Sequence, residues 1–252
     1  MDIKEKSYVF GLLITDGHLE LMERNRGKVS LEVSEKDKDI CEKLFHLIPD
    51  SHLASRERET NFKNSYKSCA FSNNQLAFRQ ELIDFGFPTE NKTLTASIPS
   101  QNYSASDFWR GVIDGDGSLG FTGQGIPYLS LVTKSENLKQ EYCKFLLDNF
   151  GIEKRINRNA RDNVYNITVY REDALAVSKV LYENAPIYLD RKYNSYLEIQ
   201  KWVRTTKKLA CKKFWTPEED EYVLTHTIEE SMSHLDRTKS SVKNRKYRLE
   251  SS

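Results

Sequence analysis

The chain has 252 residues, of which 30% are charged and 11% are aromatic, and its formal net charge at pH 7 is +1. This composition is typical of a globular protein, and the length suffices for one large domain or two modest ones with a substantial core. The sequence contains no run of 18 or more apolar residues, which excludes a transmembrane helix.

Neither the charge nor the cysteines identify a partner. A net charge near zero says nothing about nucleic acid, because opposite faces of a protein can carry opposite signs. Cys41, Cys69, Cys143 and Cys211 are widely spaced and form no paired metal-binding pattern, so we interpret them as thiols in a reducing compartment. The N-terminus has no apolar signal core. We therefore expect a cytoplasmic or nucleoid-associated protein, with an organellar or phage origin also open.

Residues 1–88 predict one repeat of helices and strands. Two stretches alternate between apolar and polar residues with the period of two that is typical of half-buried strands. The expected elements are a helix ending at Gly17, strands at 18–25 and 28–34, a helix through Ile40 and Leu44, strands at 53–60 and 62–71, and a helix ending at Gly86.

Residues 104–204 predict a second repeat with the same order of elements, after a connector at 89–103. Strands are expected at 118–122, 128–133, 154–159 and 164–170, with a helix beginning at Ser135 between the two pairs. Two copies without a third indicate a pseudo-twofold pair, not a solenoid. The predicted fold class is therefore α+β, with two pseudo-twofold-related repeats in one monomer.

Residues 205–252 differ in character. They begin with a basic linker that contains Lys207, Lys208, Lys212 and Lys213. Three short helices are then expected, the first two opened by the capping-box pairs Thr216–Glu219 and Thr227–Glu230, and the third by Thr238. This segment is predicted to be a separate small domain.

Two nine-residue stretches, Val9–Gly17 and Trp109–Gly117, stand 100 residues apart. Each is an apolar helical run that ends in Asp-Gly and has a glycine in its middle, Gly11 or Gly111. Glycine costs about 1 kcal/mol in a helix interior relative to alanine, so we expect the two backbones to approach each other at these glycines. Gly17 and Gly117 are expected to be left-handed helix-ending residues.

The acids of the two stretches, Asp16 and Asp116, would then lie together at the C-terminal ends of both helices. This is the unfavourable end for a carboxylate, and two adjacent acids repel each other. Divalent metal ions relieve both problems. Asp16 and Asp116 are therefore candidate ligands of a divalent metal ion.

The two stretches resemble the LAGLIDADG motif of homing endonucleases, present twice as in the single-chain members of that family. The resemblance covers residues 4–200 and places Asp16 and Asp116 on the metal-binding acid of the motif, which implies that they are catalytic residues of a metal-dependent phosphodiester hydrolysis. It implies an αββαββα unit per repeat, with both sheets forming a saddle over double-stranded DNA. It also implies cleavage of both strands of a long, asymmetric site across the minor groove, with Mg²⁺ (or Mn²⁺) as the cofactor and short 3′ overhangs as the product.

The first motif departs from the family pattern at Ile14, where the second has Asp114. That position is not the metal ligand of the family, so no loss of activity is expected, and Gly115 is left without an assigned role. In the family, a lysine after the last helix of each repeat reaches the cleavage centre. Lys92 and Lys192 match that position, with Arg191 as a rival in the second repeat.

Candidate DNA contacts lie on two stretches expected to be strands. Arg56 and Arg58 share one face of the first, and arginine is suited to guanine edges in the major groove. In the second repeat the residues that share a face are Arg155, Asn157, Asn159 and Arg161. Each of these residues fits an ordinary solvated strand surface equally well.

The C-terminal segment resembles a Myb/SANT-like helix-turn-helix module through Trp215, Thr216, Arg237, Thr238 and the basic last helix. Basic residues of a last helix are expected in the major groove, and the candidates are Lys239, Lys243, Arg245 and Lys246. A protein-binding module of the same kind is the alternative.

Two other functions fit the same fold. An intron maturase would bind intron RNA, and a transcription regulator would bind DNA without cutting it. The presence of both Asp16 and Asp116 favours the nuclease, and metal-dependent cutting separates it from the regulator. No flanking splice-type residues are visible, so an intron-encoded or free-standing enzyme is favoured over an intein.

Overall fold

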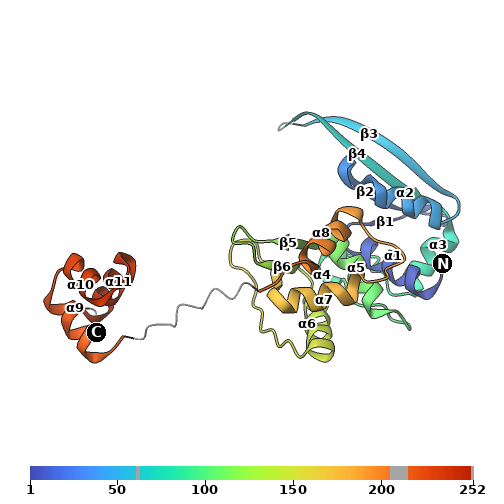
Figure 1. Ribbon diagram of the computed structural model, residues 1–252. Coiled ribbons are helices and arrows are strands. Elements are labelled where there is room, and N and C mark those ends of the chain that lie inside the picture. Colours follow the sequence, from blue (N-terminus) through green and yellow to red (C-terminus); the bar gives the residue numbers. More distant parts are fainter. Residues whose placement is uncertain (61–62, 205–214, 251–252) are drawn as a thin grey trace. The chain divides into compact units, whose positions relative to one another are not determined.

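The computed structural model describes residues 1–60, 63–204 and 215–250, without the side chains of residues 58–60 and 63–66 (Figure 1). The predicted DNA contact of Arg58 and the lysines of the basic linker therefore lie outside the described side chains. The chain divides into two compact units, Met1–Val203 and Arg204–Ser252.

The first repeat follows the predicted order of elements. Its four strands form one antiparallel sheet in the order β1-β2-β4-β3. The elements are α1 (Ile3–Thr15), β1 (His18–Leu21), β2 (Gly27–Ser34), a short 3-10 turn η1 (Glu35–Asp37), α2 (Lys38–Leu47), β3 (Ser51–Thr60), β4 (Lys63–Asn73) and α3 (Leu76–Asp84). The connector between the repeats contains one short helix, α4 (Lys92–Thr95).

The second repeat has one strand fewer. Its elements are α5 (Ala105–Asp116), β5 (Gly117–Phe121), β6 (Pro127–Thr133), α6 (Glu136–Phe150), β7 (Tyr165–Tyr170), α7 (Arg171–Tyr182) and α8 (Asp190–Gln200), and its sheet has the antiparallel order β5-β6-β7. The strand predicted at 154–159 is wrong. The Lys154 ammonium donates to the Thr168 carbonyl of β7 (2.9 Å), and the segment turns at Asn159, whose N–H donates to the Val164 carbonyl (2.8 Å).

The helices α1 and α5 run side by side through one core shared by both repeats (Figure 1). A Cβ atom placed on Gly11 would lie 2.2 Å from the Phe108 carbonyl oxygen, and one on Gly111 would lie 2.2 Å from the Tyr8 carbonyl oxygen. The predicted glycine-to-glycine approach of the two helices is confirmed, and the fold class is confirmed as α+β.

The expectation for Gly17 and Gly117 is wrong. Neither residue has a positive φ, and Gly117 is extended at φ −90° and ψ 170°. Neither position has room for a side chain, which explains both glycines. A Cβ on Gly17 would lie 2.6 Å from the Leu13 carbonyl oxygen, and one on Gly117 would lie 2.6 Å from the Ile113 carbonyl oxygen. In each repeat the backbone therefore passes from the motif helix into the first strand of the sheet within two residues.

The second unit contains α9 (Pro217–Thr225), α10 (Ile228–Leu235) and α11 (Lys239–Glu250). Both predicted capping boxes are present, and the Thr238 hydroxyl accepts from the Ser241 N–H (3.3 Å), as expected for a cap. Val223, Leu235 and Val242 form a small core of their own. Among the described residues of both units, no helix combines the length and the apolar character that crossing a membrane requires.

Candidate active site

The two candidate acids lie next to each other where the motif helices end. Asp16 directly follows α1, and Asp116 is the last residue of α5. A Cβ on Gly115 would lie 2.0 Å from the Thr15 hydroxyl oxygen and 3.4 Å from an Asp16 carboxylate oxygen. The close helix contact therefore continues to the two carboxylates, both of which reach the surface.

The two carboxylates hold their protons more tightly than isolated ones. Desolvation by the surrounding protein, followed by the negative charge of Asp16, raises the pKa of Asp116 to about 6. Desolvation also raises the pKa of Asp16, although Lys192 and then Lys92 oppose the shift. Carboxylates with raised pKa values that lie side by side are frequent at functional sites.

Both predicted lysines reach this place and cap the motif helices. The Lys92 ammonium donates to the carbonyls of Thr15 and Gly17 (2.5 Å each) and to that of Leu13 (3.3 Å). The Leu13 carbonyl also accepts from the Gly17 N–H (2.9 Å), so the ammonium adds a positive charge at a helix end where the helix dipole favours a cation.

The second lysine is arranged in the same way but is more deeply buried. The Lys192 ammonium donates to the carbonyls of Ile113 (2.5 Å), Asp114 (2.6 Å) and Gly115 (3.2 Å). Its side chain is only 3% exposed, and this desolvation lowers its pKa to about 8, whereas Lys92 is half-buried.

The charges cross between the repeats. Lys192 is the positive group with the largest effect on the pKa of Asp16, and Lys92 has the larger effect on that of Asp116. For each acid, the positive charge that lowers the pKa the most therefore belongs to the other repeat.

Arg191 takes a different position from its neighbour. Its guanidinium donates two hydrogen bonds to the Asp37 carboxylate, at 2.8 and 3.0 Å, and so links α8 to the first repeat. Lys192 and not Arg191 therefore contacts the end of the motif helix.

The donor set fits a divalent metal ion only in part. The described residues contain no group of three or more His, Cys, Asp or Glu side chains arranged to hold an ion. The Ile14 side chain has no ligand atom, and the Gly115 carbonyl already accepts from Lys192. Mg²⁺ commonly binds through one or two carboxylates, with waters and substrate phosphates as its other ligands. Asp16 and Asp116 fit that pattern once a phosphate is present.

A cavity of about 240 Å³ opens beside Asp116 and Lys92. Lys134, at the end of β6, borders it as well. Lys134 could not be selected from the sequence, since a single lysine after a strand has no distinguishing pattern.

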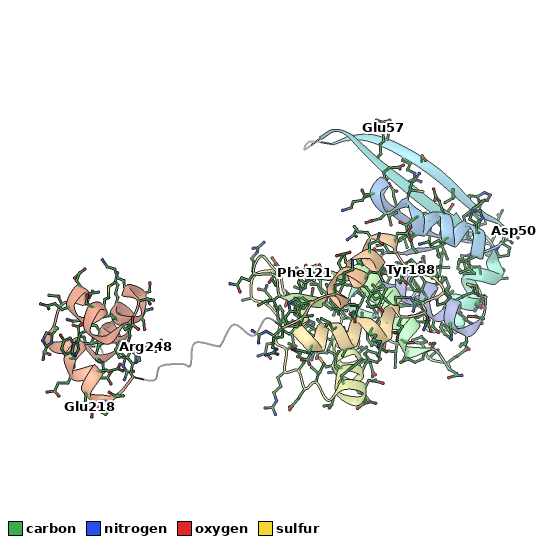
Figure 2. All side chains as sticks on the ribbon, in the orientation of Figure 1. Asp50, Glu57, Phe121, Tyr188, Glu218 and Arg248 are labelled. Carbon is green, nitrogen blue, oxygen red and sulfur yellow. The ribbon has the colours of Figure 1, made fainter. Side chains whose placement is uncertain are left out.

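Arg56 lies on the solvent face of the first sheet, as predicted. Its guanidinium donates to Glu32 (2.6 Å), which also accepts from the Ser68 hydroxyl (2.7 Å). A hollow of about 250 Å³ on this face is lined by His18 and Lys28 among others. Sequence analysis missed these two residues, although the alternation of β2 could have pointed to Lys28. The hairpin β3–β4 extends beyond α2 (Figure 1), and Glu57 marks its outer part in Figure 2.

In the second repeat the predicted DNA contacts are exposed but do not lie on a strand. Arg155 pairs with Glu153 (3.0 Å), and Arg161 pairs with Asp162 (3.1 Å). Asn157 is exposed, and the Asn159 side chain accepts from the Arg161 N–H (2.8 Å). The polar face of this sheet is formed instead by residues that the sequence analysis did not select, namely Ser118, Tyr128, Ser130, Asn166 and Thr168.

The basic residues of α11 serve different purposes. Arg245 pairs with Asp220 (2.5 Å), and Lys246 donates to the His226 carbonyl (2.8 Å), so both help to hold the three helices together. Lys239 pairs with Glu229 at 3.3 Å on the surface. Lys243 is exposed and has no partner within the described part of the chain.

Comparisons with known proteins identify the fold. The family described as LAGLIDADG-like domain matches residues 105–180. The solved structure of the homing endonuclease I-WcaI bound to its DNA recognition sequence has a TM-score of 0.57 and 14% identity, and the match covers 77% of this chain and 86% of that one. At this identity the likeness shows the fold alone, and we base the fold assignment on this match.

Two further matches have lower TM-scores. The LAGLIDADG homing endonuclease I-GzeII in complex with its DNA target has a TM-score of 0.47 and 14% identity, with 95% and 96% of the two chains covered. The N-terminal LAGLIDADG domain of DUF199/WhiA has a TM-score of 0.44 and 13% identity, with 71% and 82% covered. No curated protein sequence matches the chain.

Proposed function

We propose that this chain, which has the fold of the LAGLIDADG homing endonucleases, hydrolyses both strands of a long DNA site with the help of divalent metal ions. The observation that carries the proposal is the adjacency of Asp16 and Asp116 at the ends of two glycine-packed helices. One acid from each repeat matches the two strands of a duplex. Their raised pKa values mark a site where a cation is favoured.

In this proposal Asp16 and Asp116 hold Mg²⁺ or Mn²⁺ together with phosphate oxygens of the DNA. The metal would polarise the phosphate and lower the pKa of a bound water. Lys92 and Lys192 remain at the helix ends, where their charges offset those of the carboxylates and polarise solvent at the phosphate. The lysine of the other repeat lowers the pKa of each acid the most, so we propose that each half-site uses groups of both repeats.

The DNA-binding surfaces follow from the positions of the acids. Asp16 and Asp116 immediately precede the first strands of the two sheets, so DNA held at the acids would lie along the polar faces of both sheets. Arg56 and Lys28 are the basic candidates on the first face, and an antiparallel ribbon fits the major groove. The second unit would be a Myb/SANT-like module that adds phosphate contacts through the exposed Lys243 and Lys239.

Cleavage of a randomised duplex library tests the proposal. Wild-type protein and the Asp16→Asn/Asp116→Asn double variant are incubated with the library and Mg²⁺, and the cut ends are sequenced. We expect wild type to enrich one long motif and the double variant to cut nothing.

The same experiment separates the alternatives. If both proteins retain specific DNA but neither cuts it, the chain is a regulator. If neither cuts DNA and both retain group I intron RNA, the maturase function replaces the nuclease.

A further inference from the structure

The motif position at which the repeats differ, Ile14 and Asp114, has no part in the proposed chemistry. In the second repeat the Asp114 carboxylate is buried, with 3% of the residue exposed. It accepts hydrogen bonds from the hydroxyls of Tyr8 (2.7 Å) and Tyr182 (2.6 Å) and from the Leu189 N–H (2.8 Å). Three such donors satisfy a buried carboxylate, and removing it would leave buried polar groups unpaired.

Leu189 connects this carboxylate to the second candidate lysine. It is the residue before α8, and its carbonyl accepts from the Lys192 N–H (3.0 Å). The Lys192 ammonium returns to the carbonyls of Asp114 and its two neighbours. Asp114 therefore binds the backbone segment that carries Lys192, and the Lys192 ammonium in turn binds the end of the helix that carries Asp114.

Ring contacts fix the same segment further. The ring of Tyr188, labelled in Figure 2, stacks on that of Tyr193 with centroids 4.0 Å apart. Tyr182, one of the Asp114 donors, stacks on Tyr196 at 5.7 Å. The start of α8 is thus held on two sides of Lys192.

The first repeat has no equivalent arrangement. Ile14 is buried and apolar, so it offers no acceptor to the segment that carries Lys92. That segment is the four-residue helix α4, preceded by Asn91 in a left-handed conformation (φ 46°). Lys92 is half-buried and borders the cavity beside Asp116.

We infer that Asp114 is a positioning residue that fixes Lys192 at one half-site, so that cleavage of one DNA strand, and not of the other, depends on it. The inference rests on the proposed nuclease function. Displacement of a catalytic group by about 1 Å can lower a rate about 100-fold. Loss of the Asp114 acceptors should therefore slow one strand about 10- to 100-fold.

The test measures single-turnover cleavage of each strand at pH 7, on the recovered target with a different fluorophore on each strand. Lys192→Met identifies the dependent strand, and Lys92→Met should affect the other one. Asp114→Leu should slow the same strand as Lys192→Met. Asp114→Asn should restore the wild-type ratio of the two rates, because its amide oxygen can still accept from Leu189 and Tyr8.

Asn73→Leu is the matched control. Asn73 is fully buried, and its side chain makes three hydrogen bonds in the first sheet, to Pro49, Ser51 and Gln75. Its substitution should lower stability without changing the ratio of the strand rates. If Asp114→Leu does not fold, Tyr182→Phe removes one Asp114 donor and should shift the ratio in the same direction by less.

Equal slowing of both strands by Asp114→Leu or Tyr182→Phe, or slowing of the strand that depends on Lys92, would overturn the inference. So would equal slowing of both strands by Lys192→Met. Cutting by the Asp16→Asn/Asp116→Asn variant would instead refute the proposed nuclease centre.

Discussion

Replacing Gly111 by alanine tests whether the contact between the motif helices organises the site. The added Cβ would lie 2.2 Å from the Tyr8 carbonyl oxygen and 2.8 Å from the Leu12 nitrogen, both backbone atoms of a buried helix. Ordinary contacts of carbon atoms are about 3.5–4.0 Å, so the helices must move apart by about 1 Å or more.

The magnitude follows from two opposing terms. Alanine gains about 1 kcal/mol of helix propensity over glycine. Overpacking a core costs about 1–3 kcal/mol and occasionally more, and we take the upper end because backbone atoms cannot rotate away. The net loss is about 2 kcal/mol, which lowers the Tm of a unit of this size by about 4–8 °C.

Differential scanning calorimetry of Gly111→Ala measures this change. Gly123→Ala is the matched control, since a Cβ there has nothing within 4 Å and its φ is not positive. The control should match or slightly exceed wild type. A Gly111→Ala protein that melts with or above the Gly123→Ala control would refute the close-contact argument.

Three further predictions follow from the charges. The folded pKa of Asp116 is about 6, above the ordinary 3.8, so its contribution to stability is lost as the pH rises through about 6. Without divalent ions, Asp116→Asn should therefore be more stable than wild type above pH 6, by at most about 1 kcal/mol because the side chain is exposed, and equally stable near pH 4. Equal Tm values of the two proteins at pH 8 would contradict the raised pKa. Arg56→Ala should weaken target binding by about 1–3 kcal/mol and relax the preference at one base pair, whereas uniform weakening in a binding selection would indicate a phosphate contact. Removing residues 205–252 should weaken binding and reduce its salt dependence while cleavage at saturating protein persists; loss of all cutting would show that this segment is more than an affinity module.

The sequence could predict features whose cause is local or repeated. Gly11 and Gly111 are costly within a helix, so their presence already required a close neighbour, and the structure supplies it. The resemblance to the LAGLIDADG motif selected Lys92 and Lys192, which stand 100 residues apart in the sequence and which the structure places at the two helix ends.

Other features depended on tertiary contacts that no local pattern reveals. The alternation at 154–159 correctly predicts exposure of Arg155 and Asn157, but a strand also needs a backbone partner, and the Lys154 side chain takes the Thr168 carbonyl of β7. Arg245 resembles a DNA contact in sequence, yet it pairs with Asp220 on another helix. The role of Asp114 was also hidden, because its partners Tyr8, Tyr182 and Leu189 lie far away along the chain.

The most direct test of the central claim is the cleavage rate of the recovered target by Asp16→Asn and Asp116→Asn, each measured beside its DNA affinity in Mg²⁺. The proposal predicts that either change abolishes or cripples double-strand cleavage while DNA binding is largely spared. If either variant cuts both strands at the wild-type rate, the two acids are not the catalytic centre.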